Sequence, residues 1–182
     1  IFAVTALLIS GISVSASDVH IWNGGVSANA PSQTGDGYYI IKTPEELAWA
    51  AKQVNSGFTE LRIRLNNDIY LNDVNEDVYV NKWTPIGNYA QDTSKVYSGF
   101  FDGQGYTIYG LYIDTTAEYQ GLFGYALSAN IKNVDLEAVK IKASSNVGGI
   151  SGYMKQSTTV QNCTVSGEIE ATGNNVGGIS GY

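Results

Sequence analysis

The chain of 182 residues has one cysteine, Cys163, one histidine, His20, and one methionine. A single cysteine forms no internal disulfide bond, so the fold has to be stabilised by packing alone. Cys163 aligns with Val134 when the sequence is compared with itself, which predicts an inward, unreactive thiol. His20 has no cysteine or serine partner nearby in the sequence, which excludes a zinc set or a catalytic triad around it and predicts a surface position.

Basic residues are also scarce. Lysine and arginine number 10 against 17 acidic residues, and the formal net charge is −7. The basic residues never cluster into a patch that could follow phosphates, which excludes nucleic acid as a partner. The acidic composition, rich in glycine and tyrosine, is typical of an extracellular β protein. No residue pattern indicates a cofactor.

No hydrophobic run is long enough to span a membrane. Residues 1–12 form an apolar stretch interrupted by polar and small residues, and further small residues follow it. This pattern predicts a signal peptide over residues 1–16, without its initial methionine and basic part, and therefore a secreted or cell-surface protein. Because Tyr182 falls within a repeat, we expect further repeats or domains of the same chain beyond it.

The most informative feature of the sequence is this repeat. A glycine-bounded pentapeptide ending in tyrosine starts at Gly121, Gly149 and Gly178, with separations of 28 (149 − 121) and 29 (178 − 149) residues. A unit of this length cannot bury its apolar face alone and has to stack on copies of itself. We therefore predict an all-β fold, a parallel β-helix or β-solenoid. The repeated motif positions are Gly121, Leu122, Phe123, Gly124, Gly149, Ile150, Gly152, Gly178, Ile179 and Gly181.

The alignment of the last two repeats predicts which residues stack about 4.8 Å apart on neighbouring turns. Aliphatic residues should form inward stacks, and aligned asparagines should form an amide ladder at a bend. Glycines are expected to permit the positive φ values of the bends. The expected pairs are Ile131 with Val160, Asn133 with Asn162, Leu136 with Val165, and Val147 with Val176.

An earlier turn shows a similar apolar pattern. Ile108, with the apolar residues that follow it, resembles Ile131 and the residues after it. The offset between Ile108 and Ile131 is smaller than the period of the later repeats, which predicts a shorter turn at this point, since loops vary in length while the core spacing does not.

A helix is expected before the repeats. Thr43 is a capping residue, Pro44 stands at the first helical position, and Glu46 follows three residues after the cap. The apolar positions recur every three or four residues, so one side of the helix should cover the first turn of the solenoid. The expected parts are an extended leader over 17–37, a strand at 38–41, a capping helix near 44–55, and a solenoid over 38–182.

Several of these segments resemble the GLUG-motif repeat proteins, a family of bacterial secreted and surface proteins. The matching segments are Gly121-Leu-Phe-Gly124, Trp83-Thr-Pro-Ile-Gly87 and residues 101–113, although the later repeats have Ile150 and Ile179 in place of leucine. The resemblance implies a right-handed parallel β-helix in adhesins, large surface proteins or the stalks of extracellular peptidases. It implies no catalytic residue within the repeat.

One acidic segment has part of a calcium-loop pattern. Asp73, Asn75 and Asp77 have the spacing of the first three ligands. Val78 stands where glycine is required, however, and Thr84 stands where a bidentate glutamate belongs. We interpret the segment as a solvated loop and predict no metal site in it.

Three further acidic residues lie on or near successive turns: Asp102, Asp114 and Asp135. Sugar-cleaving enzymes place two carboxylates at a fixed separation, so a glycan-cleaving β-helix is one alternative function. A turn that needs aspartate and glycine explains Asp102-Gly103 equally well. No paired motif with a supporting base or metal is visible, so we expect no catalytic residue in this segment.

Thirteen tyrosines remain to be explained. Tyr106, Tyr109 and Tyr112 stand beside inward aliphatic residues, and most of them should point outward, where aromatic rings can stack on sugars or on a protein. The alternative is that tyrosine simply suits exposed strand positions.

Together these features predict a non-catalytic, secreted or cell-surface protein with a structural or adhesive role, binding extracellular glycan or a host surface protein. The alternatives are the stalk of an extracellular peptidase and a polysaccharide-binding or polysaccharide-degrading β-helix protein.

Overall fold

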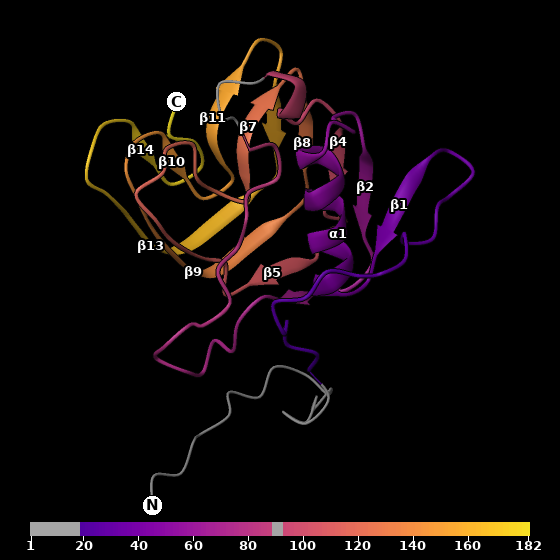
Figure 1. The fold of residues 1–182 in the computed structure, drawn as a ribbon, viewed down its shortest axis with the longest axis horizontal. Coiled ribbons are helices and arrows are strands. Elements are labelled where there is room, and N and C mark those ends of the chain that lie inside the picture. Colours follow the sequence, from indigo (N-terminus) through magenta and orange to yellow (C-terminus); the bar gives the residue numbers. More distant parts are fainter. Residues whose placement is uncertain (1–18, 89–92) are drawn as a thin grey trace, which may run out of the picture.

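The computed structural model of the chain describes residues 19–88 and 93–182 (Figure 1). The signal peptide expected over residues 1–16 lies outside this part. The described residues form short strands, one α-helix, α1 (Pro44–Asn55), and a short 3-10 helix, η1 (Thr93–Lys95). In these two ranges, no helix has both the length and the apolar character needed to cross a bilayer.

The strands form parallel sheets in which neighbours come from successive turns of the chain. One five-stranded sheet has the order β1 (Tyr38–Ile41), β2 (Arg62–Leu65), β4 (Phe100–Asp102), β8 (Asn130–Lys132) and β12 (Thr159–Gln161). A second contains β13 (Thr164–Ala171), β9 (Asp135–Ala143), β5 (Thr107–Tyr109) and β3 (Ile69–Tyr70), with β6 (Tyr112–Asp114) also paired to β9. Two smaller sheets pair β7 (Phe123–Leu127) with β11 (Ser151–Lys155), and β10 (Val147–Gly148) with β14 (Val176–Gly177).

This arrangement is a β-solenoid, which confirms the predicted fold class. Figure 1 shows the coils of the chain stacked beside one another, with α1 packed against them. The interior is one continuous apolar cluster that includes fully buried residues from every sheet, among them Ile63, Ile108, Phe123, Ile131 and Val147.

The stacking of the last turns follows the predicted alignment. Ile131 pairs with Val160, Leu136 with Val165, and Val147 with Val176. The amide ladder is present as well, because Asn162 Nδ2 donates to Asn133 Oδ1 at 3.1 Å.

The predicted alignment of Ile108 with Ile131, and with it the shorter turn, is wrong. Ile108 pairs with Leu136, and Phe101 pairs with Ile131, so these separations are close to the period of the later repeats. The inward position over Ile131 is occupied by Phe101, whose ring meets Phe123 edge-on at 5.3 Å between centroids. Successive inward residues look alike in sequence, so the apolar pattern alone did not distinguish one strand of a turn from the next.

The role expected for glycine at the bends is confirmed at Gly105 and Gly110, whose φ values are 82° and 68°, but no motif glycine has a positive φ. The repeated bends have their positive φ at asparagines, with 54° and 51° at Asn133 and Asn162 and 56° and 64° at Asn146 and Asn175. Asparagine tolerates this conformation because its short polar side chain bonds locally. Among the motif glycines, a Cβ on Gly152 would lie 2.5 Å from the backbone nitrogen of Gln120. The motif glycines other than Gly178, where a Cβ would meet open space, serve the close approach of neighbouring turns.

The helix begins and ends where the sequence predicts. Thr43 Oγ1 accepts from the backbone N–H of Glu46 at 3.3 Å, and Glu46 Oε2 accepts from the N–H of Lys42 at 2.7 Å, which caps the first turn. Leu47 and Val54 are fully buried on the solenoid. At the other end, Asn55 Oδ1 accepts from the N–H groups of Gly87 and Asn88, and its Nδ2 donates to Pro85 O.

The segment before β1 is also packed on the solenoid. Ile21 forms a parallel bridge with Tyr70 of β3, and the N–H of Trp22 donates to Tyr70 O at 2.8 Å. The Trp22 side chain is buried. This segment therefore lies beside β3 and adds one bridge at that edge of the second sheet.

Residues 73–81, between β3 and β4, form a loop that projects from the stack (magenta, lower left in Figure 1). The buried side chain of Asn72 holds its base: Oδ1 accepts from the N–H groups of Val80 and Asn81, and Nδ2 donates to Asn81 O and Gly110 O. The acidic segment that begins at Asp73 lies in this loop.

Candidate functional site

Two of the predicted tyrosines belong to aromatic pairs on the outer side of the second sheet. Tyr109 of β5 stacks on Tyr70 of β3, with ring centroids 4.6 Å apart and an interplanar angle of 10°. Tyr112 of β6 meets Tyr79 of the projecting loop edge-on at 6.2 Å. We call these four residues the tyrosine face. It arises because Tyr109 and Tyr112 alternate with buried Ile108 and Ile113 along strands of period two.

Two lysines hold the outer part of the tyrosine face. Lys140 Nζ lies 4.1 Å from the ring centroid of Tyr79 and donates to Asp77 O at 2.8 Å. Lys82 Nζ lies 5.9 Å from the ring centroid of Tyr112 and forms an ion pair with Asp114 at 3.1 Å. A cation over an aromatic ring is favourable and restricts both groups. The loop tip is therefore held at a fixed position against β6 and β9.

Burial has the largest effect on the pKa values of Tyr70 and Tyr109, the first of the two tyrosine pairs. It raises the pKa of Tyr70 and of Tyr109, and the nearby carboxylates of Asp68 and Glu137 act in the same direction, while a hydrogen bond with Thr107 partly opposes the rise for Tyr109. Both phenols are therefore protonated at neutral pH and can donate a hydrogen bond to a partner.

Tyr106, the third predicted tyrosine, has a different environment. It is half-buried and packs against the core cluster, ahead of β5. The structure thus brings Tyr109 and Tyr112 to the outer side of strands that both pair with β9 and places Tyr106 at the edge of the core.

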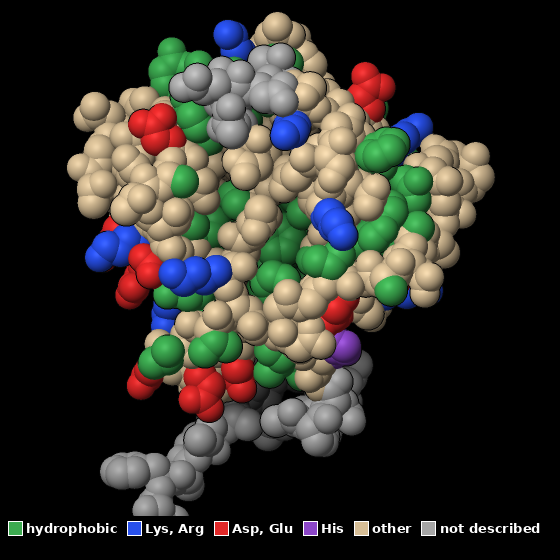
Figure 2. All heavy atoms as spheres, viewed as in Figure 1, with side chains coloured by type: hydrophobic (Ala, Val, Ile, Leu, Met, Phe, Trp, Pro, Cys, Tyr) green, Lys and Arg blue, Asp and Glu red, His purple; other side chains and the backbone are tan. Residues whose placement is uncertain are grey.

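Charged side chains surround the tyrosine face in alternating rows. In the register of the second sheet, Tyr112 lies beside Lys140, and Asp114 lies beside Lys142, which pairs with Glu170 at 3.7 Å. A shallow cleft of about 170 Å³ runs between these rows. Figure 2 shows charged side chains of both signs interspersed over the visible side of the molecule. A partner would thus meet the half-buried rings of Tyr70, Tyr109 and Tyr112 within a mixed-charge surface. Tyr79 is buried, with Lys140 over its ring, and supports Tyr112 from within.

The three carboxylates considered for catalysis lie opposite other kinds of side chain. Asp102 pairs in register with Arg64 and Lys132, Asp114 with Lys142, and Asp135 with Thr107 and Thr164. Thr164 Oγ1 donates to Asp135 Oδ1 at 2.6 Å. None of the three registers places two of these carboxylates opposite each other.

Asp102 starts the asparagine ladder. Its Oδ1 accepts from the N–H of Gln104 and from Asn133 Nδ2, and its Oδ2 lies 3.5 Å from Lys132 Nζ. Burial acts to raise the pKa of Asp102, but the two hydrogen bonds and the lysine outweigh it and hold the pKa below its ordinary value. Asp102 is an ionised turn residue.

In the acidic segment that begins at Asp73, the Asp73 carboxylate accepts hydrogen bonds from within the segment itself. Asp73 Oδ1 accepts from both the backbone N–H and the Nδ2 of Asn75. Within residues 19–88 and 93–182, no group of three or more His, Cys, Asp and Glu side chains is arranged to hold a metal ion.

His20 lies at the surface, as the sequence predicts, and Cys163 packs inward as predicted but is only half-buried. His20 is exposed and pairs with Glu45 of α1, with Nε2 3.0 Å from Oε2. Cys163 packs against the core cluster, and its thiol donates to Gln161 O. Burial raises the pKa of this thiol, which makes it a poor nucleophile.

Sequence analysis missed a second aromatic feature. Tyr125 and Tyr153 stack at 4.7 Å, and Tyr153 and Tyr182 stack at 4.7 Å with an interplanar angle of 8°. These are the last residues of the three repeated pentapeptides, so the regular spacing of the pentapeptides already contained the signal. In-register stacking turns any repeated residue into a column.

The fold and the aromatic face define a β-solenoid with a patterned outer surface. A stretch of 92 residues, 50% of this chain, is 38% identical to halomucin from Haloquadratum walsbyi. The match covers 1% of halomucin, so the chain corresponds to a very small part of that protein. No family model and no solved structure matches the chain.

Proposed function

We propose that this chain is a non-catalytic repeat domain of a secreted or cell-surface protein, with a structural role and an adhesive one. The observation that carries the proposal is the tyrosine face, a set of paired rings held on a stacked sheet. The partner would be an extracellular glycan or a host surface protein. The similarity of half the chain to halomucin, whose name describes a mucin, is consistent with an extracellular location.

Physical chemistry favours binding at this face. Tyrosine supplies a large contact area with little loss of side-chain entropy, and its hydroxyl can donate to a partner. The stacked Tyr70–Tyr109 pair and the cation-held Tyr79–Tyr112 pair are already ordered. A partner therefore meets a preorganised surface and loses less free energy on binding.

We also propose membership of the GLUG-motif repeat proteins. The support is the Gly121-Leu-Phe-Gly124 tetrapeptide, in which Leu122 and Phe123 are fully buried and Gly121 lies in close contact with Gly148 of the next turn. In the second copy, a Cβ on Gly149 would likewise meet Gly178 O of the next turn, and Ile150 is fully buried.

The test is a binding screen with the purified chain against immobilised glycans and host surface proteins. The double variant Tyr109→Ala, Tyr112→Ala should weaken any captured interaction at least about tenfold, as loss of aromatic anchors does. Phe58→Ala is the matched control, because Phe58 is 63% exposed and lies outside the tyrosine face.

Circular dichroism has to show that the double variant keeps its fold. Binding that is unchanged in the double variant, or reduced equally by Phe58→Ala, would contradict the proposal. Hydrolysis of any bound glycan, followed by the release of smaller products, would contradict the non-catalytic part.

A further inference from the structure

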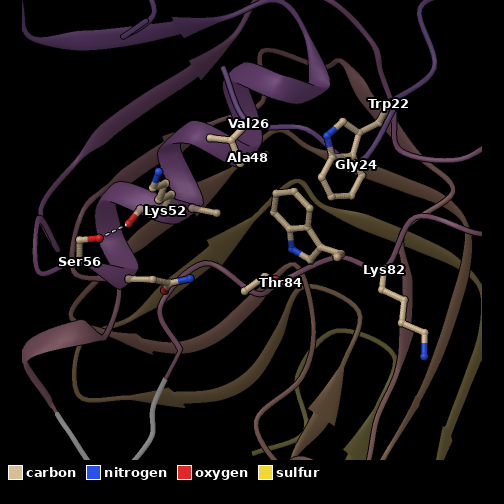
Figure 3. A pocket seen from close by; sticks show the side chains of 11 residues that line it. Trp22, Gly24, Val26, Ala48, Lys52, Ser56, Lys82 and Thr84 are labelled. Atoms are coloured by element: carbon tan, nitrogen blue, oxygen red, sulfur yellow. Dashed lines mark hydrogen bonds between the residues drawn. The ribbon is translucent and has the colours of Figure 1, made fainter. Parts of the chain in front are cut away.

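A cavity lies between α1, the segment before β1 and residues 82–84. Its volume is about 360 Å³, within the range of small-molecule sites. Figure 3 shows Trp22 on one side, and on the other Ala48 and Lys52 of α1 with Ser56, which follows the helix. Figure 2 shows hydrophobic side chains at the surface in the middle of this side of the molecule, next to α1.

Two indole rings and two alanines give the cavity an apolar wall. Trp22 and Trp83 meet edge-on at 5.8 Å between centroids, and Ala48 and Ala51 present methyl groups from the helix. Both indole N–H groups are already used, since Trp22 Nε1 donates to Gly25 O and Trp83 Nε1 donates to Leu122 O. The rings therefore offer a ligand only carbon surface.

Most polar side chains around the cavity also have hydrogen-bond or ion-pair partners within the protein. The amide of Asn55 makes three hydrogen bonds to backbone groups, and Ser56 Oγ donates to Lys52 O. The side chain of Lys82 runs away from the helix in Figure 3, and its ammonium group is paired with Asp114. Within the described residues, the Lys52 ammonium group and the Thr84 hydroxyl have no hydrogen-bond or ion-pair partner.

The charge of the lining contrasts with that of the chain. The net charge is −7, yet the described residues that line the cavity include two lysines and neither aspartate nor glutamate. A negatively charged group would therefore be attracted to the Lys52 side of the cavity and would meet no like charge within its wall.

These observations select one class of ligand. We propose that the cavity binds a small carboxylate with an apolar body, the body lying against Trp22 and Trp83 and the carboxylate on Lys52 and Thr84. A sugar acid fits less well because its several hydroxyls would meet only two free side-chain donors, and each hydroxyl buried without a partner weakens binding about tenfold. This site shares Lys82 with the edge of the tyrosine face but none of its four tyrosines, so its failure and the failure of the proposed function can be told apart.

The experiment is an NMR titration of the indole N–H signals. The chain has three tryptophans, and Trp49 packs on Tyr39, outside the cavity lining, so its signal serves as an internal control that Trp49→Phe assigns. Phenylacetate should shift the Trp22 and Trp83 signals in a saturable manner and leave that of Trp49 in place. Neutral phenylacetamide and the polyhydroxylated glucuronate should each bind about tenfold more weakly.

Two lysine variants separate a specific contact from general attraction. Lys52→Gln should weaken phenylacetate binding about tenfold, whereas Lys82→Gln, which removes the same charge from the same lining, should change it less than about twofold. The proposal is overturned if the Trp22 and Trp83 signals do not move, if phenylacetamide binds as tightly as phenylacetate, or if the two variants behave alike. Glucuronate binding equal to that of phenylacetate would overturn the requirement for an apolar body.

Discussion

At the scale of single residues, Asp102, Asn133 and Asn162 form one hydrogen-bonded column across three turns. Each asparagine donates to the preceding turn, Asn162 to Asn133 and Asn133 to Asp102. The column satisfies polar groups at a bend where the sheet ladder is interrupted. Its first member is an ionised carboxylate, so the column should make stability depend on pH.

The first prediction concerns Asp102→Asn. The folded-state pKa of Asp102 lies below its ordinary value of 3.8, so its contribution to the free energy of unfolding is present above that pH and is lost as the pH falls through the folded pKa. Urea unfolding should therefore show the variant less stable than the parent chain at pH 7, with the difference shrinking below about pH 4.

Asp114→Asn is the control for that experiment, because Asp114 is about half exposed in its ion pair with Lys82. It should change stability by less than about 1 kcal/mol at pH 7. If the difference in unfolding free energy between Asp102→Asn and the parent chain stayed constant from pH 7 to pH 3, stability would not depend on the ionisation of Asp102 and the prediction would be wrong.

The second prediction concerns the motif glycines. In Gly152→Ala the new Cβ would lie 2.5 Å from the backbone nitrogen of Gln120, and backbone cannot move aside cheaply. We expect a loss of about 1–3 kcal/mol or more in the free energy of unfolding. Gly35→Ala, where no atom lies within 4 Å of the new Cβ, should stay within about 0.5 kcal/mol of the parent. Equal effects of the two substitutions, measured by chemical denaturation, would contradict the close-approach role.

At the scale of elements, the cap of α1 gives the third prediction. Thr43→Ala removes the acceptor for the N–H of Glu46 and should cost about 1 kcal/mol, whereas Thr43→Ser keeps the hydroxyl and should cost much less. Thermal unfolding of the two variants checks this expectation. A Thr43→Ser variant as unstable as Thr43→Ala would show that the methyl group matters more than the hydrogen bond.

The same elements show how much the sequence predicts. The bounds of α1 and β1 followed from local signals, a capping threonine with proline and a short apolar run between polar segments. The register of the last turns followed from a strict repeat. The register of β4 and β5 did not follow, because it depends on Phe101 filling the core against Phe123, which is a contact between distant segments.

The candidate site was predicted only in part for the same reason. Tyr109 and Tyr112 were recognisable as outward residues beside buried aliphatic ones. Their partners Tyr70 and Tyr79 come from a preceding turn and from a loop, and no periodicity connects these positions. The cavity between the two indole rings likewise joins segments that are far apart in the sequence and requires the helix between them to be placed first.

At the scale of the whole molecule, stability should be greatest in the middle of the stack. In the first sheet, β4 and β8 have a paired strand on each side, while β1 has β2 on one side and only an isolated antiparallel bridge, Gln33 with Tyr39, on the other. The fourth prediction is that the amide protons of Phe101 and Ile131 exchange with solvent more slowly than that of Tyr39 on β1, because opening the centre requires breaking two ladders. Native-state hydrogen exchange measures this directly, and identical rates would indicate a single unit that opens all at once.

The parallel register also has a mechanical consequence. Backbone hydrogen bonds between turns point along the stack, while the strands run across it. A pull along the stack should therefore load one ladder at a time and separate the turns in sequence at low force. A pull along the strands would load several bonds of a ladder together. A surface protein built from such turns would therefore resist sideways drag better than axial tension.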